Sequence, residues 1–171
     1  MTVLVTGGSG SGKSAWAEKL ADTLPRENRV YVATMQVYDE ESRLRVKRHR
    51  EQRADKGFVT VECEKDLENA GIPENSTVLV EDLVNLTANE MFGGGDVSRI
   101  VPALQSLSRR CRHLILVTGD LFSDGHAYSP SVQDYLRCLA DVNRQAAEMA
   151  DCVVEVVYSI PVALKGELPC V

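Results

Sequence analysis

The sequence predicts a three-layer α/β fold, in which helices cover both faces of a largely parallel sheet. Short apolar runs rich in Val, Ile and Leu alternate with longer segments of helical periodicity, a pattern typical of right-handed strand–helix–strand units. A glycine-rich loop joins the first apolar run to the first helical segment. Because 44% of the 171 residues are hydrophobic and no linker rich in Pro, Gly or Ser divides them, we expect residues 1–171 to form a single domain.

Six apolar runs bounded by turn signals are the predicted strands: 2–6, 29–33, 58–62, 77–81, 113–118 and 152–158. The helical patterns between them cover 13–24, about 39–52, 83–92, about 97–111, and 131–150. Two apolar runs in 153–164 flank Ser159, Ile160 and Pro161, so the chain could end in an antiparallel edge hairpin. The three glycines at 93–95 are interpreted as a helix C-cap and turn rather than as a mobile substrate loop.

Composition and charge restrict the function classes. The net charge of −6 argues against broad nucleic-acid binding. The chain shows no signal-peptide pattern at its start and no run of 18 apolar residues, so neither secretion nor a membrane span is expected. The five cysteines form no Cys-x-x-Cys pair and have no histidine at zinc-ligand spacing, so we interpret them as buried or incidental residues. Such cysteines are best compatible with a protein of the reducing cytoplasm.

The glycine-rich loop has the pattern of a phosphate-binding loop. Glycines free backbone N–H groups to surround phosphates, a lysine reaches the β- and γ-phosphate oxygens, and a hydroxyl binds Mg²⁺. A flexible Gly/Ser turn is the alternative interpretation, but it does not explain a Lys-Ser pair where the helix begins. We therefore predict a fold like that of P-loop NTPases, with nucleoside triphosphate bound by Gly7, Gly8, Ser9, Gly10, Ser11, Gly12, Lys13 and Ser14.

An acidic pair, Glu81 and Asp82, lies at the end of the strand predicted at 77–81. Ligands of parallel sheets lie beyond the carboxyl ends of the strands, and a phosphate-loop enzyme places a Mg²⁺ carboxylate there. Glu81 is the first choice for this ligand, and Ser14 would share the ion. Asp82 is the reserve, since aspartate is the better N-cap for the helix that starts near Leu83. Asp120 lies near a turn and is interpreted as a solvated loop carboxylate.

Residues 43–53 carry six Lys or Arg residues and one histidine, His49. A solvated helix face, a nucleic-acid patch and a polyphosphate site all remain open as interpretations, although the acidic total charge disfavours the second. On a helix, Arg45, His49 and Arg53 share one face. Guanidinium neighbours favour the neutral, nucleophilic imidazole and would stabilise charge on an attacked phosphate, so His49 is a candidate nucleophile.

Several motifs in order resemble the bifunctional adenosylcobinamide kinase/adenosylcobinamide-phosphate guanylyltransferase family of cobalamin biosynthesis. They are Val-Thr-Gly-Gly-x-x-Ser-Gly-Lys-Ser at 5–14, Tyr-Val-Ala-Thr at 31–34, Asp-Glu-Glu…Arg-Leu…His-Arg…Arg at 39–53, Thr-Val-Glu at 60–62, Val-Leu-Val-Glu-Asp-Leu…Asn at 78–89, and Val-Asn-Arg-Gln…Ala-Asp at 142–151. The resemblance covers nearly the whole chain. It implies phosphorylation of adenosylcobinamide, or a related corrinoid, by GTP or ATP with Mg²⁺. GMP would then pass from GTP to the new phosphate through a guanylylated histidine.

The resemblance also implies roles for particular residues. His49 matches the guanylylated histidine, and Lys13 is the second catalytic residue. A compact homotrimer is expected. The implied guanine-nucleotide site is lined by Thr34, Met35, Gln36, Arg50, Glu51, Gln52, Arg53, Glu62 and Glu81.

The chain departs from the family pattern in three places. Gly10 occupies a position where arginine is usual, Phe58 one where tryptophan is usual, and the loop 119–126 replaces Asn-Glu-Val-Gly followed by Gly-Ile-Val-Pro. Two alternatives stay open: a small-molecule kinase without guanylyl transfer, and a GTP-binding regulatory protein. Only the family interpretation predicts a guanylyl adduct at His49. His126 is interpreted as an exposed loop residue without function and His113 as structural.

Overall fold

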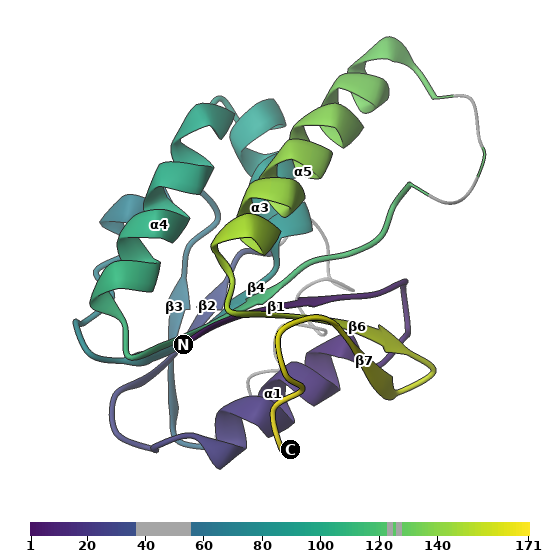
Figure 1. Cartoon of the computed structure of the whole chain (residues 1–171). Helices are drawn as coiled ribbons and strands as arrows, with labels where there is room; N and C mark the ends of the chain where they lie inside the picture. Colours follow the sequence, from purple (N-terminus) through teal and green to yellow (C-terminus); the bar gives the residue numbers. More distant parts are fainter. Residues whose placement is uncertain (37–55, 123–124, 126–127) are drawn as a thin grey trace.

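The central sheet has the strand order β3-β2-β4-β5-β1-β6-β7 in the computed structural model, which describes residues 1–36, 56–122, 125 and 128–171 (Figure 1). The strands are β1 (Thr2–Thr6), β2 (Arg29–Ala33), β3 (Phe58–Glu62), β4 (Thr77–Glu81), β5 (His113–Val117), β6 (Cys152–Val157) and β7 (Ile160–Lys165). All neighbouring pairs are parallel except β6 and β7. The predicted parallel α/β sheet is therefore confirmed.

Helices cover both faces of this sheet, as Figure 1 shows. Helix α1 (Lys13–Thr23) packs on one face through Trp16, Ala17, Leu20 and Ala21. Helices α3 (Leu83–Phe92), α4 (Ile100–Arg110) and α5 (Pro130–Met149) cover the other face. Two short 3₁₀ helices, η1 (Leu67–Asn69) and η2 (Val97–Arg99), complete the described elements. No helix among the described residues is long and apolar enough to cross a membrane.

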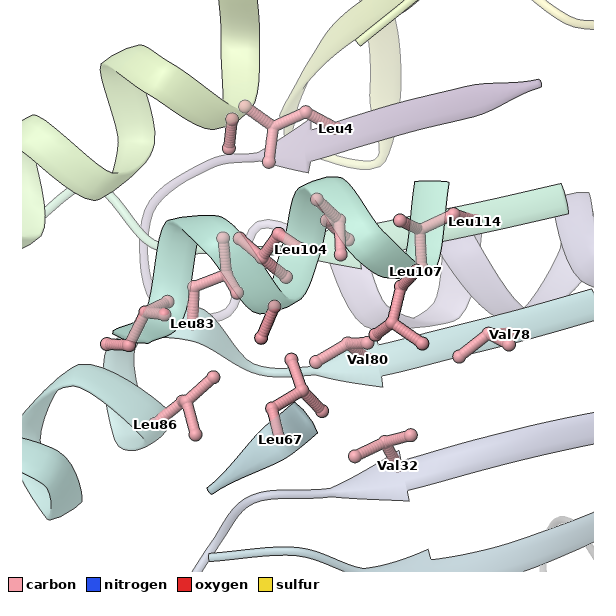
Figure 2. Close-up of a cluster of buried hydrophobic side chains, with 14 of the residues drawn as sticks. Leu4, Val32, Leu67, Val78, Val80, Leu83, Leu86, Leu104, Leu107 and Leu114 are labelled. Carbon is pink, nitrogen blue, oxygen red and sulfur yellow. The ribbon is translucent and has the colours of Figure 1, made fainter. Parts of the chain in front are cut away.

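Successive residues of the central strands pack on opposite faces of the sheet, although nearly all of them are buried. In β4, Val78 and Val80 face α4, whereas Leu79 joins the cluster around α1. Figure 2 shows the larger cluster, in which Leu104 and Leu107 of α4 lie over Val80 and Val78. Both faces of the central strands are apolar because helices cover both, which explains why these strands are near-continuous Val/Leu/Ile runs.

Most predicted boundaries are confirmed to within a residue. Strands β1 to β4 have the predicted ends, and β5 and β6 each end one residue earlier than expected. The segment predicted as one helix at 97–111 begins instead with the 3₁₀ turn η2. Pro102 has no N–H to donate to the carbonyl of Ser98, so the α-helical ladder cannot extend through this turn. The helix predicted at about 39–52 lies outside the described residues.

The predicted antiparallel hairpin at the end of the chain is confirmed. Strands β6 and β7 are joined by a two-residue turn in which Tyr158 and Ser159 have φ of 50° and 64°. Positive φ at both central positions makes the turn match the twist of the hairpin strands. The predicted glycine turn is also confirmed, since Gly93 is the C-cap of α3 and its N–H donates to the carbonyl of Asn89 at 2.8 Å.

Candidate active site

The phosphate loop passes from the end of β1 to the start of α1 in close contact with the terminal hairpin. A Cβ at Gly7, whose φ is 153°, would lie 2.5 Å from the carbonyl oxygen of Val156 in β6. A Cβ at Gly12, with φ of 93°, would lie 2.7 Å from Oγ of Ser159. The backbone N–H of Ser159 donates to the carbonyl of Ser11 at 2.8 Å. Glycine at these two positions is thus required by the approach of β6 and its turn.

The start of α1 is open to an anion. Its N-cap is Gly12, no side chain caps the first turn, and no acidic residue lies there. The N–H groups of that turn therefore lack helical partners and carry the positive end of the helix dipole. Lys13 Nζ donates to the carbonyl of Gly8 at 3.2 Å, so the ammonium group lies across the loop. The buried Oγ of Ser11 has no hydrogen-bond partner among the described residues.

The predicted metal residues Ser14 and Glu81 meet in the structure. The Ser14 hydroxyl hydrogen-bonds to the Glu81 carboxyl, and Tyr31 Oη donates to Glu81 Oε2 at 3.2 Å. Burial raises the pKa of Glu81, against the opposing effect of the bond from Ser14. A hydroxyl and a carboxylate are the oxygen ligands that Mg²⁺ prefers. The donor set therefore fits a magnesium ion bound to a triphosphate.

Asp82 has the capping role that the sequence indicated. Its carboxylate accepts from the backbone N–H of Asn85 at 2.7 Å and from Asn85 Nδ2 at 2.9 Å, which caps α3. Burial raises the pKa of Asp82, while the bonds from Asn85 and the nearby Lys13 ammonium oppose this rise. Among the described residues, no group of three or more His, Cys, Asp and Glu side chains could hold a metal ion. A cation at this site would therefore depend on phosphate oxygens and water for its remaining ligands.

Thr34 and Asn89 hold the ends of three strands together. Thr34 is fully buried; its hydroxyl donates to the carbonyl of Asp82 at 2.8 Å and accepts from the Asp82 N–H at 2.7 Å. Nδ2 of the buried Asn89 donates to the carbonyls of Thr34 and Glu64, at 2.7 and 3.0 Å. In the sequence, Asn89 is only the last residue of the motif at 78–89, with no role assigned to it, although an amide on the buried face of an apolar helix is the available signal.

The remaining candidates on β2 and β3 lie at the same edge of the sheet. Ala33 pairs with Glu62 on one side and Glu81 on the other, so the two carboxylates point to the face covered by α1. They are two strands apart, about 10 Å. Gln36 Nε2 donates to Glu64 Oε2 at 2.9 Å, and Met35 is half-buried beside it. His49, Arg50, Glu51, Gln52 and Arg53 lie outside the described residues.

Two cavities adjoin the phosphate loop, and Gly8 lines both. The smaller, of about 280 Å³, lies between residues 8–11 and 155–158. The larger, of about 550 Å³, lies between the loop after β5 and the first turns of α5. Asp120, which lines the larger cavity, is exposed, and its carboxylate accepts from the N–H of Phe122 at 3.0 Å. His113 lies at the opposite end of β5.

Comparison with known proteins identifies relatives along nearly the whole chain. The family model for cobinamide kinase / cobinamide phosphate guanyltransferase matches residues 3–164. The bifunctional adenosylcobalamin biosynthesis protein CobU of Escherichia coli (strain K12) is 32% identical over 184 residues, which cover 96% of this chain and 100% of that protein. The protein of the same name from Salmonella typhimurium (strain LT2) is 29% identical over 185 residues, with coverage of 96% and 100%.

The fold also resembles that of a solved structure. The flagellar accessory protein FlaH from Methanocaldococcus jannaschii superposes with a TM-score of 0.56 at 12% identity, covering 97% of this chain and 78% of that chain. At this identity the likeness concerns the fold alone.

Proposed function

The chain belongs to the cobinamide kinase / cobinamide phosphate guanyltransferase family, and we propose that the phosphate loop and His49 carry its two reactions. The protein is a transferase. It phosphorylates adenosylcobinamide and transfers GMP from GTP to adenosylcobinamide phosphate, which gives adenosylcobinamide-GDP in cobalamin biosynthesis.

The observation that carries the residue assignment is the contact between Ser14 of α1 and Glu81 of β4. Residues 67 positions apart in the sequence bring a hydroxyl and a carboxylate together beside the open start of α1. In a phosphate-loop enzyme these two groups hold Mg²⁺, which neutralises charge on the β- and γ-phosphates when it is bound. Gly7 to Gly12 would surround the phosphates with backbone N–H groups, and Lys13 would move from the Gly8 carbonyl to the β- and γ-oxygens.

For guanylyl transfer we propose that His49 is the nucleophile. Its imidazole nitrogen attacks the α-phosphorus of GTP and pyrophosphate leaves; the phosphate of adenosylcobinamide phosphate then displaces the histidine from the guanylyl group. The support is the resemblance together with the basic residues around His49, which suit charge building on phosphate. The buried Thr34 would support the guanine-nucleotide site by its two hydrogen bonds to the backbone of Asp82. Direct contacts with the guanine nucleotide are proposed for Met35, Gln36, Arg50, Glu51, Gln52, Arg53 and Glu62.

Radiolabelled GTP tests the histidine step. Incubation of the protein with Mg²⁺ and GTP labelled at the α-phosphate should leave label on the protein that is acid-labile and base-stable, as expected of a phosphoramidate. Label at the γ-phosphate should not be retained, and His49→Ala should lose the adduct while still binding nucleotide. If the wild-type protein binds GTP but retains no label from the α-phosphate, the guanylyl-histidine intermediate is refuted. That outcome would favour a kinase without guanylyl transfer or a GTP-binding regulatory protein.

We further propose a homotrimer located in the cytoplasm. The resemblance supports the trimer, and strand β7 offers an apolar edge, with Ile160, Val162 and Leu164 exposed by 64%, 45% and 59%. In the part of the chain that the structure describes, β7 is the last strand of the sheet, and exposed apolar residues on such an edge strand favour association with another chain. The cytoplasmic location is supported by the five cysteines, all of which are free thiols.

A further inference from the structure

The larger cavity beside the phosphate loop has a wall that the proposed nucleotide site does not use. Val132, Tyr135 and Leu136 from the first turns of α5 form its apolar side, and Asp120 contributes a carboxylate. Gly8 closes the cavity toward the phosphate loop. The volume of about 550 Å³ is within the usual range for small-molecule sites, which are mostly apolar with few polar groups.

Hydrogen bonds hold this cavity in a fixed position relative to the phosphate loop. The Asp120 N–H donates to the carbonyl of Gly7 at 3.3 Å, which joins the loop after β5 to the phosphate loop. Tyr135 Oη donates to the carbonyl of Val84 at 3.0 Å, next to the Glu81 and Asp82 pair. Gly119 is buried, and a Cβ there would lie 3.2 Å from Cγ2 of Val84. The cavity wall is therefore attached both to the phosphate loop, at Gly7, and to the segment after β4, at Val84.

The position of Lys13 indicates which phosphate would face this cavity. Lys13 Nζ contacts the Gly8 carbonyl, and a phosphate-loop lysine binds the β- and γ-oxygens. Gly8 is also part of the cavity lining. A molecule in the cavity would therefore contact the part of the loop that holds the terminal phosphates, where a kinase must place the acceptor hydroxyl.

Resting on the kinase function proposed above, we propose that this cavity receives the aminopropanol arm of the corrinoid and that Asp120 is the catalytic residue that accepts the hydroxyl proton. The hydroxyl oxygen forms a bond to the γ-phosphorus, the bond from that phosphorus to the β–γ bridging oxygen breaks, and nucleoside diphosphate leaves. The hydroxyl proton passes to the Asp120 carboxylate. The apolar residues of α5 contact the carbon skeleton of the arm and the adjoining edge of the macrocycle.

The conservative variant Asp120→Asn tests the proton acceptor. The amide oxygen can still accept from the Phe122 N–H, so the local turn is kept. We expect kcat for phosphorylation of adenosylcobinamide to fall about 100-fold or more, with the Kd for triphosphate unchanged. Guanylyl transfer to preformed adenosylcobinamide phosphate should change little, because that acceptor has no hydroxyl proton to lose. Equal loss in both reactions, or an unchanged kcat for the kinase, would overturn the role of Asp120.

The variant Val132→Trp tests the cavity itself by filling it. We expect KM for the corrinoid to rise at least tenfold, with triphosphate binding and thermal stability unchanged. Ala140→Trp, on the exposed side of the same helix, is the matched control and should behave like the wild type. An unchanged corrinoid KM in Val132→Trp, with an active wild type, would overturn the cavity assignment. A wild-type protein that neither phosphorylates adenosylcobinamide nor transfers GMP to adenosylcobinamide phosphate would overturn the proposed function and this inference together.

Discussion

Lys13 is the residue on which both reactions should depend, because both begin with a bound triphosphate. Its ammonium group lies on the Gly8 carbonyl, at the mouth of the phosphate loop. We expect Lys13→Ala to weaken GTP and ATP binding at least tenfold and to impair both half-reactions. Isothermal titration calorimetry measures the affinity. Lys19→Ala, at an exposed position of α1, is the control, and unchanged GTP affinity in Lys13→Ala would contradict the phosphate-loop assignment.

Glu81 and Asp82 differ in what their carboxylates contact, so their amide variants should differ in effect. Glu81→Gln removes the charge beside Ser14 and should lower Mg²⁺-dependent kinase activity about 100-fold. Asp82→Asn keeps an efficient N-cap for α3 and should leave stability within about 0.5 kcal/mol. The measurement is activity as a function of Mg²⁺ concentration, alongside urea unfolding. A larger loss of activity in Asp82→Asn than in Glu81→Gln would assign the metal to Asp82.

At the scale of elements, Asn89 joins α3 to the ends of β2 and β3. Its amide donates to two backbone carbonyls, those of Thr34 and Glu64, from a buried position. Asn89→Ala would leave both carbonyls without these bonds, so we expect the free energy of unfolding to fall by about 1–3 kcal/mol. Urea denaturation measures it. Gln105→Ala, on the exposed face of α4, is the control and should change stability by less than about 0.5 kcal/mol; similar effects in the two variants would show that the Asn89 bridge contributes nothing.

The predictability of each element depended on whether its signal was local. Strands β2 and β4 were predicted with their observed ends, because continuous apolar runs indicate burial on both faces without knowledge of their neighbours. The 3₁₀ turn η2 is an exception, because apolar periodicity does not distinguish a 3₁₀ turn from the first turn of an α-helix and the local signal is the single residue Pro102. The role of Asn89 was missed because its two partners lie 55 and 25 residues away in the sequence.

At the scale of the whole molecule, the apolar edge strand β7 is where we expect subunits to meet. Lysines on an edge strand oppose pairing with another chain because association would bury their charges. The double variant Ile160→Lys/Val162→Lys should therefore be monomeric, with a mass near 18.8 kDa, where the wild type has the mass of three chains. Multi-angle light scattering measures this. Glu167→Lys, exposed beyond β7, should stay trimeric; a monomeric wild type would refute the trimer, and a trimeric double variant would place the interface elsewhere.

We also propose that residues 1–171 unfold as one domain. The seven strands form one sheet, and buried residues of β1 belong to both clusters that pack on it. Thermal unfolding should then be a single transition, identical when followed by circular dichroism and by the fluorescence of Trp16. Two separated transitions would contradict a single domain.

The sequence by itself determined the α/β alternation, most of the strand ends, the phosphate loop and the family resemblance, because each depends on contiguous residues or on the order of motifs. The tertiary structure decided which distant residues meet. It joined Ser14 to Glu81, brought Asn89 to the carbonyls of Thr34 and Glu64, and placed the Asp120 cavity beside Gly8. The physical reason is that strand order and helix packing bring these residues together, and the spacing along one chain does not specify either.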